Sequence, residues 1–434
     1  MRLPADLRFA RSQLLAFFLA AFLSTLAPLA SAQPSPVGSV PEGVAPEAMA
    51  QIGALLADKE TRTKAQQKLD SQLLYGARMA ALREAAPGVP AQEVNLRYVE
   101  GASAVAGTKL VLVDIRVAAN SNATVVAAIE LLGGQINTNV PQFNAIRAAV
   151  PLDQLESLAG LAEVRFVAPA SVMENDTGSV NSEGDRTLGT DTARLALQLP
   201  TGNVKVCVLS DSASATGLAN SVASGNLSPG QVTVLPGQAG TGADEGVAML
   251  EIINDLAPGA QLFFSTANGG EAAFAQNILS LRSTYNCDVM VDDIRYATEV
   301  PFQDAVIARA VNTVTAGGAL YFASAGNSGN KSDGTSGTWV GDFVNGGAFV
   351  VPGVATAYEV HSFQTAPSVQ NFNVVNSGGS SYALSLFWSD PENGSANDYD
   401  VFQLNAAGTA VVSSSTNVQN GTQNAFESTT LATG

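Results

Sequence analysis

Basic residues are scarce in this sequence. Lys and Arg number 21 against 38 Asp and Glu, so the formal net charge is -17 over 434 residues. Binding to nucleic acid or to an anionic membrane surface needs clustered Lys and Arg, and the charge balance therefore argues against both partners. The remaining composition, 46% hydrophobic and 14% charged with 40 glycines, is typical of a mostly folded chain that is long enough for two or three domains.

Cysteine is nearly absent. Cys207 and Cys287 have neither the spacing of a metal site nor that of a redox motif. Both residues fall in or beside expected strands of one sheet. The sequence therefore allows two states for this pair, a disulfide or two buried free thiols.

Long apolar runs are confined to the N-terminus. Arginines precede the apolar run of residues 14–29, and Ala30-Ser31-Ala32 follows it. This order predicts a secretory signal peptide over residues 1–32, with a retained anchor as the alternative, and hence a secreted protein that is extracellular or periplasmic. Nothing later reaches the ~18 consecutive apolar residues of a spanning helix, so no membrane contact is expected after signal cleavage.

Three regions are expected before the centre of the chain. Residues 33–107 read as a linker followed by helices with an apolar face. Residues 108–170 show the order βαββαβ, which indicates a ferredoxin-like α+β domain. Residues 171–200 are polar and rich in turn formers, which indicates a linker and a site for proteolysis.

From residue 201 to 360 the pattern changes to alternating strands and helices. This alternation predicts a doubly wound, mainly parallel α/β sheet. No Gly-x-Gly-x-x-Gly follows the first strand, which argues against a dinucleotide site. The expected strands are 204–209, 232–235, 261–266, 288–294 and 319–324, and the expected helices are 245–256, 272–282 and 302–315.

Three segments of this sheet carry polar groups at positions where α/β proteins build sites. Asp211 follows the apolar strand 204–209 directly. The Gly-rich loop 240–244 leads to Glu245 at the start of an apolar helix, and Asn327 follows a later strand within Ala325-Gly326-Asn327. Because sites in open parallel sheets form at the carboxyl ends of the strands, these side chains are expected to meet there.

In this order, over about residues 200–330, the segments resemble the subtilase-type serine peptidases, the superfamily that includes subtilisins and sedolisins. The resemblance implies that Asp211 is the triad aspartate and that Asn327 donates a hydrogen bond to the oxyanion. It also implies that Asp288 to Tyr296 lines a cleft for protein or peptide substrates. The preceding α+β domain resembles the family's propeptide, a folding chaperone and temporary intramolecular inhibitor.

The chain departs from the subtilisin pattern at the histidine. Glu245-Gly246 stands where subtilisins have His-Gly, and the sole histidine, His361, lies beyond the matched region and is interpreted as a surface or turn residue. Sedolisins use a glutamate, but their partner aspartate lies four residues on, where this chain has Met249. A carboxylate with a raised pKa can accept a serine proton, and nearby Asp211 would raise one pKa. An acidic pH optimum is expected.

The nucleophile is the second departure. Gly334-Thr335-Ser336 is expected to lie in a loop, because it cannot open a buried helix. Residues 361–434 alternate with period 2 and indicate an inserted, incomplete β-sandwich. The sequence is therefore interpreted as truncated at its C-terminus, with the serine beyond residue 434.

Two further sets of acids are candidates for binding. Asp293, next to Asp292, could select basic substrate residues, join the acid cluster, or simply be a hydrogen-bonded strand end. The second set could bind a structural calcium ion, which is the one cofactor considered, or could consist of solvated acids in turns. Its members are Asp390, Asp398 and Asp400.

The sequence therefore predicts a secreted serine endopeptidase with an Asp211, Glu245 and Ser site. The alternative is a catalytically inactive relative that acts as a binding or adhesion module. Carbohydrate binding through Trp388 and Tyr399 is a third interpretation, although such aromatic residues more often belong to a core.

Overall fold

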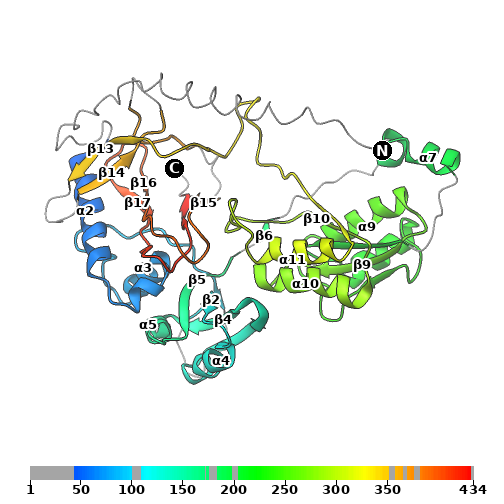
Figure 1. The fold of residues 1–434 in the computed structure, drawn as a ribbon, viewed down its shortest axis with the longest axis horizontal. Coiled ribbons are helices and arrows are strands. Elements are labelled where there is room, and N and C mark those ends of the chain that lie inside the picture. The colour runs from blue at the N-terminus through cyan, green and yellow to red at the C-terminus, as the bar shows by residue number, and fades with distance from the viewer. Residues whose placement is uncertain are drawn as a thin grey trace, which may run out of the picture.

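The computed structural model describes residues 44–99, 109–171, 173–174, 183–197, 204–350, 357–364, 369–375 and 382–431. The predicted signal peptide lies outside these residues. No helix among them has the length and apolar character needed to cross a membrane. The described chain forms three packed bodies, an α+β body, an α/β body and a mixed body (Figure 1).

The α+β body is an antiparallel sheet with two helices. Its strands run in the order β5-β2-β4-β3, and β1 (Tyr98–Val99) also pairs with β2. Alternate residues of β2, such as Val113 and Ile115, are buried beneath the helices, as the period-2 pattern requires. Its elements are β2 (Leu110–Val117), α4 (Asn122–Leu131), β3 (Gln135–Val140), β4 (Ala145–Pro151), α5 (Leu155–Ala159) and β5 (Val164–Pro169).

The α/β body is a five-stranded parallel sheet in the order β12-β10-β7-β9-β8. The central strand β7 is buried on both faces: Cys207 and Leu209 pack in one core and Val206 and Val208 in the other. This explains its unbroken apolar run. The elements are β7 (Lys205–Ser210), α8 (Ala215–Ser224), β8 (Val232–Val234), α9 (Glu245–Leu256), β9 (Gln261–Thr266), α10 (Glu271–Tyr285), β10 (Val289–Asp292), α11 (Val306–Ala316) and β12 (Leu320–Ala323).

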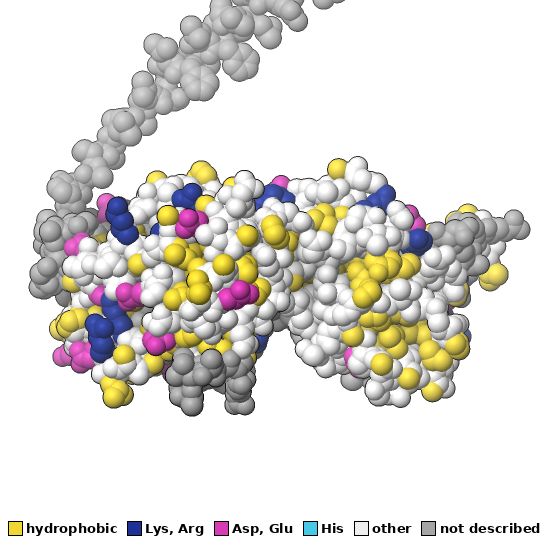
Figure 2. Space-filling view, turned by 90° about the horizontal axis from the view of Figure 1, so that it is seen from below, with side chains coloured by type: hydrophobic (Ala, Val, Ile, Leu, Met, Phe, Trp, Pro, Cys, Tyr) yellow, Lys and Arg dark blue, Asp and Glu magenta, His cyan; other side chains and the backbone are white. Residues whose placement is uncertain are grey.

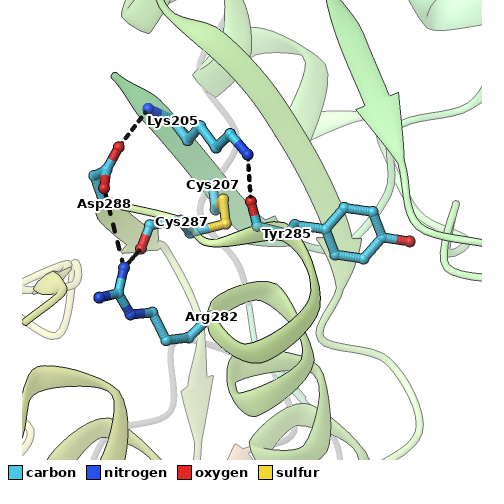
Figure 3. The surroundings of a disulfide bond; sticks show 6 residues. All are labelled: Lys205, Cys207, Arg282, Tyr285, Cys287 and Asp288. Carbon is cyan, nitrogen blue, oxygen red and sulfur yellow. Dashed lines mark hydrogen bonds and ion pairs between the residues drawn. A yellow bond between two sulfur atoms is a disulfide. The ribbon is translucent and has the colours of Figure 1, made fainter. Parts of the chain in front are cut away.

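The two cysteines form a disulfide inside this body (Figure 3). Cys207 lies on β7 and Cys287 just before β10, and their Cα atoms are 6.0 Å apart, a normal separation for a disulfide. Arg282 donates to the carbonyl of Cys287 (2.7 Å) and Lys205 to that of Tyr285 (2.8 Å). The sequence allowed either a disulfide or two free thiols, and the structure contains the disulfide.

The mixed body contains segments from both the N-terminal and the C-terminal parts of the described chain. The N-terminal helices α2 and α3 pack against three antiparallel strand pairs, β13 with β14, β15 with β18, and β16 with β17 (Figure 1). Their bounds are α2 (Pro46–Thr61), α3 (Ser71–Ala80), β13 (Asn345–Val350), β14 (Ala357–His361), β15 (Tyr382–Phe387), β16 (Val401–Leu404), β17 (Val411–Ser415) and β18 (Phe426–Leu431).

Two short helices lie in the stretch that the sequence indicates as a linker. They are α6 (Gly184–Thr187) and α7 (Thr190–Leu197). Arg194 pairs with Asp185 and donates to the carbonyl of Leu256 at the end of α9, so this stretch contacts the α/β body. On the face shown in Figure 2, Lys and Arg side chains are few and do not gather into a single patch.

Candidate active site at the carboxyl end of the parallel sheet

Asp211 holds the loop before α9 against the end of β7. Its carboxylate is buried and accepts hydrogen bonds from the backbone N–H groups of Ser212, Ala243 and Glu245, the last at 3.0 Å. Its own carbonyl accepts from Thr266 (2.6 Å) and Asn268 (3.0 Å). With three amide donors, Asp211 fixes the first residue of α9, and thereby the backbone that carries Glu245.

The loop before α9 needs glycines because its backbone lies very close to Asp211 and Phe264. A Cβ at Gly242 would lie 2.2 Å from Asp211 Oδ2, and one at Gly240, whose φ is +73°, would lie 2.0 Å from the Asp211 carbonyl. At Gly246 a Cβ would lie 2.3 Å from the ring of Phe264. Only glycine permits these approaches, so the Gly-rich pattern reflects packing around Asp211.

Asp244 is a further residue of the site that the sequence interpretation missed. It has φ of +61° and caps α9, and its carboxylate accepts from Ser214 N (2.8 Å), Ser214 Oγ (2.6 Å) and Ser212 Oγ (3.1 Å). Burial alone would raise the pKa of Asp244, but these hydrogen bonds lower it below its ordinary value. Its position directly before the expected start of the helix at Glu245 was the available signal.

Glu245 presents one free carboxylate oxygen. The residue is 7% exposed, and Oε2 accepts a hydrogen bond of 2.7 Å from Ser210 Oγ. Oε1 is buried and has no hydrogen-bond partner. A buried acceptor without a partner is costly unless something else supplies the donor, so this oxygen is where the site can take up a proton.

The pKa of Glu245 is raised to about 7. Burial is the largest cause, the hydrogen bond from Ser210 opposes it, and the nearby charges of Asp293 and Asp211 raise the pKa further. The carboxyls of Asp293 and Glu245 can hydrogen-bond to each other only when one of them holds a proton, and with both ionised Oε1 of Glu245 has no partner. Of the roles considered for Asp293, the structure therefore favours membership of the acid cluster.

Asp292 belongs to a different environment from its neighbour. It accepts a hydrogen bond from Tyr321, and burial raises its pKa to about 6. Burial also raises the pKa of Glu299 to about 7, helped by the charges of Glu271 and Asp292. Asp292, the last residue of β10, and Asp293, which follows it, thus meet different acids, since successive residues of a strand face opposite sides.

A short strand from the N-terminal half of the chain lies beside this site. β6 (Met173–Glu174) pairs antiparallel with β11 (Arg295–Tyr296), which begins two residues after Asp293. Such strand addition is a common way for a protein to bind an extended peptide through its backbone. The segment that follows the α+β body thus adds a short antiparallel strand to β11.

The other predicted site residues lie elsewhere. Asn327 is exposed in the segment that follows β12, so the structure does not place it against Glu245, and its oxyanion role stays a prediction. Ser336 lies in an exposed loop, as predicted. His361, which the sequence indicates as a surface or turn residue, ends β14 instead of lying in a turn; it is half-buried among the rings of Trp339 and Phe363, and burial lowers its pKa.

The predicted calcium ligands have other partners. Asp390 accepts from the backbone of Ala396 and Asn397 (3.0 and 2.8 Å), which lowers its pKa. Asp398 and Asp400 bind the ammonium of Lys59 at 2.9 and 2.7 Å. In the part of the chain that the structure describes, no group of three His, Cys, Asp or Glu side chains is arranged to hold a metal ion.

The proposed carbohydrate-binding aromatic residues pack on each other. The rings of Trp388 and Tyr399 meet edge to face with centroids 5.1 Å apart. The indole N–H of Trp388 donates to Ser395 Oγ at 2.9 Å. Both residues are half-buried, so the structure favours the core interpretation.

Comparison with known proteins gives no assignment. No family model matches the sequence, and no curated protein does so either. Two solved structures of the epidermin leader peptide processing serine protease (EpiP) from Staphylococcus aureus, one a mutant, align with TM-scores of 0.36 and 0.35 and identities of 12% and 13%. They cover 52% and 51% of this chain and only 63% and 61% of their own length. Likeness at this level is too low to assign a fold or a function.

Proposed function

We propose that this chain belongs to a secreted serine endopeptidase of subtilase type in which Glu245 replaces the catalytic histidine. The observation that carries the proposal is the free, buried Oε1 of Glu245 beside Asp293, at the carboxyl end of a parallel sheet. Such an oxygen is suited to accept a proton from a hydroxyl nucleophile.

In the proposed reaction a serine oxygen attacks the carbonyl carbon of the substrate, and its proton passes to Glu245 Oε1. The same proton then moves to the amine that leaves, and water hydrolyses the acyl-enzyme by the same route. Asp211 positions Glu245 through the backbone, and Ser210 holds the other oxygen. Ser210 itself is not the nucleophile, because it is fully buried on β7 and already donates to Glu245.

The raised pKa of Glu245 changes the expected pH dependence. A general base must be ionised, and with a pKa of about 7 Glu245 loses its proton only as the pH approaches neutrality. We therefore expect kcat/KM to rise through about pH 7. The sequence predicts an acidic optimum for a carboxylate base, and a pKa of about 7 for Glu245 moves the expected rise of kcat/KM toward neutral pH.

The pairing of β6 with β11 supports the role of the preceding α+β body as an intramolecular inhibitor. An extended segment held along β11 by backbone hydrogen bonds would block other peptides from pairing with the same edge. We propose that maturation cuts the chain after Glu174 and before residue 200. Intact-mass measurement of the secreted protein tests this, since retention of the N-terminal half in one continuous chain would contradict it.

The decisive test is Glu245→Gln in the full-length secreted protein. Gln keeps the size and the hydrogen bond from Ser210 but cannot accept a proton, so kcat on an unfolded protein substrate should fall at least about 100-fold. Glu251→Gln, six residues along the same helix and half-exposed, is the matched control and should keep full activity.

The alternative of an inactive binding module gives the opposite result. There, neither substitution changes any hydrolysis above the uncatalysed background. If Glu245→Gln and Glu251→Gln behaved alike, Glu245 would have no role as a base and the peptidase proposal would fail.

A further inference from the structure

The N-terminal helical segment, residues 44–94, completes the fold of the β-module, the described residues from 345 to 431. We propose that this segment is a tightly docked partner of the β-module and stays bound to it when the chain is cut between them. The segment should stay bound whether or not the chain cuts itself.

The apolar part of the interface is a shared core. Leu55 and Leu56 of α2 and Tyr75 of α3 are buried in one cluster with Phe349 and Val411 of the β-module. Removing the helices would expose the strand side of this cluster to water. Burial of large apolar side chains on both sides favours docking and hence a lasting complex.

A buried cation from α2 neutralises acids of the β-module. Lys59 is 7% exposed, and its ammonium binds Asp398 and Asp400 at 2.9 and 2.7 Å. Glu427 lies fully buried in the same network and accepts from Asn417 N (3.0 Å) and Gln419 Nε2 (2.7 Å). Without Lys59, the mostly buried Asp400 would lose the cation that it binds directly and would retain the charge of Arg62 without a hydrogen bond to it, a costly state.

A second polar contact joins the start of α3 to the end of β17. Asn417 accepts from Ser71 N (2.7 Å) and donates to Asp70 (3.1 Å). Thr416 accepts from Arg62 twice, through its carbonyl at 2.6 Å and its hydroxyl at 3.0 Å, and its hydroxyl also bonds to that of Tyr75 at 2.8 Å. These bonds fix one orientation of the segment, because each depends on direction as well as distance.

The composition of β17 shows why the strand needs this partner. Its residues 413–415 are three serines, all buried, although serine is usually exposed. The segment supplies partners along it: Gln92 accepts from Ser414 Oγ (3.2 Å), and the backbone of Glu93 donates to Val412 O (3.1 Å). Burial of hydroxyl groups without such partners would be unfavourable.

To test the proposal, the folded chain is cut with a protease between the segment and the rest of the protein. A recognition sequence for an added site-specific protease is placed between residues 102 and 106 of the Glu245→Gln protein, so that no self-cleavage contributes. After the cut, size-exclusion chromatography in native buffer should show the segment eluting with the remainder. Elution of the segment alone, at micromolar protein, would overturn the proposal.

Substitutions then locate the contact. The segment also touches the α+β body through Leu73 and Leu74 of α3, so co-elution alone does not identify its partner. Lys59→Met, which affects the β-module side, should weaken retention at least about 100-fold. The exposed Lys64→Met is the matched control and should not weaken retention. Equal retention of the two variants would overturn the assignment to the β-module.

Thr416→Val provides a milder variant in case Lys59→Met fails to fold. It keeps the shape of the side chain and removes the hydroxyl that bonds to Arg62 and Tyr75. Loss of hydrogen bonds of this kind should weaken retention about 5- to 10-fold. Unchanged retention would contradict the proposed docking surface.

Discussion

Two clusters of buried carboxyl groups in this protein have opposite surroundings. In the mixed body, Asp400 binds Lys59, and Glu427 accepts from backbone and amide donors. In the α/β body, Glu245 has other acids near it, no adjacent cation among the described residues, and one oxygen without a partner. The first cluster is satisfied and the second is not.

The difference separates a structural from a functional role. A paired and hydrogen-bonded acid holds elements together, whereas an unsatisfied acid with a raised pKa is prepared to exchange a proton. Burial raises the pKa in both clusters, to about 6 for Asp400 and about 7 for Glu245, so the pKa alone does not distinguish them. The hydrogen-bond partners of each carboxylate oxygen distinguish the two clusters.

The largest expected effect is a loss of stability on removal of the disulfide, which lies in the α/β body. Replacing Cys207 and Cys287 together by Ser removes a bond that spans 80 residues, which should lower the free energy of unfolding by about 4 kcal/mol. Urea denaturation followed by hydrogen exchange should place the loss in the α/β body. Equal loss in the mixed body would mean that the two bodies unfold as one unit and that the comparison between them fails.

The next effect contrasts the two acid clusters directly. Lys59→Met should lower the free energy of unfolding by about 3 kcal/mol, because it leaves the mostly buried Asp400 without the cation that it binds. Glu245→Gln should change it by less than about 1 kcal/mol, since no cation loses its partner there. Chemical denaturation of both variants measures this, and a Glu245→Gln loss as large as that of Lys59→Met would assign Glu245 a structural role.

The smallest effect concerns the titration of Glu245. Asp293→Asn removes a charge that raises the pKa, so the pKa should fall from about 7 toward its ordinary 4.5. Carbon-13 NMR of labelled glutamate carboxyls would follow it, and the rising limb of kcat/KM should move to lower pH. Asp292→Asn, whose acid bonds to Tyr321 instead, is the control. No shift on Asp293→Asn would separate Asp293 from the site.

Much of the α/β body could be predicted from the sequence because its pattern is local. The expected helix 245–256 and strand 261–266 coincide with α9 and β9. The helix expected from Phe302 begins only at Val306, because Phe302 is half exposed and Gln303 bonds to Asp390 of another body. Asp211 and Glu245 were found because strand ends and helix starts meet at one edge of a parallel sheet.

Tertiary structure alone decided which groups surround those residues. Neither the approach of Asp293 to Glu245 nor the pairing of Lys59 with Asp400, 341 positions away, leaves a periodic trace in the sequence. The three serines of β17 carry no apolar pattern in the sequence, yet they are buried beside the N-terminal segment, where Gln92 accepts from Ser414. Sequence determined the local elements through side-chain periodicity and backbone preference; the protonation and partners of the buried acids follow from long-range packing, which no local pattern encodes.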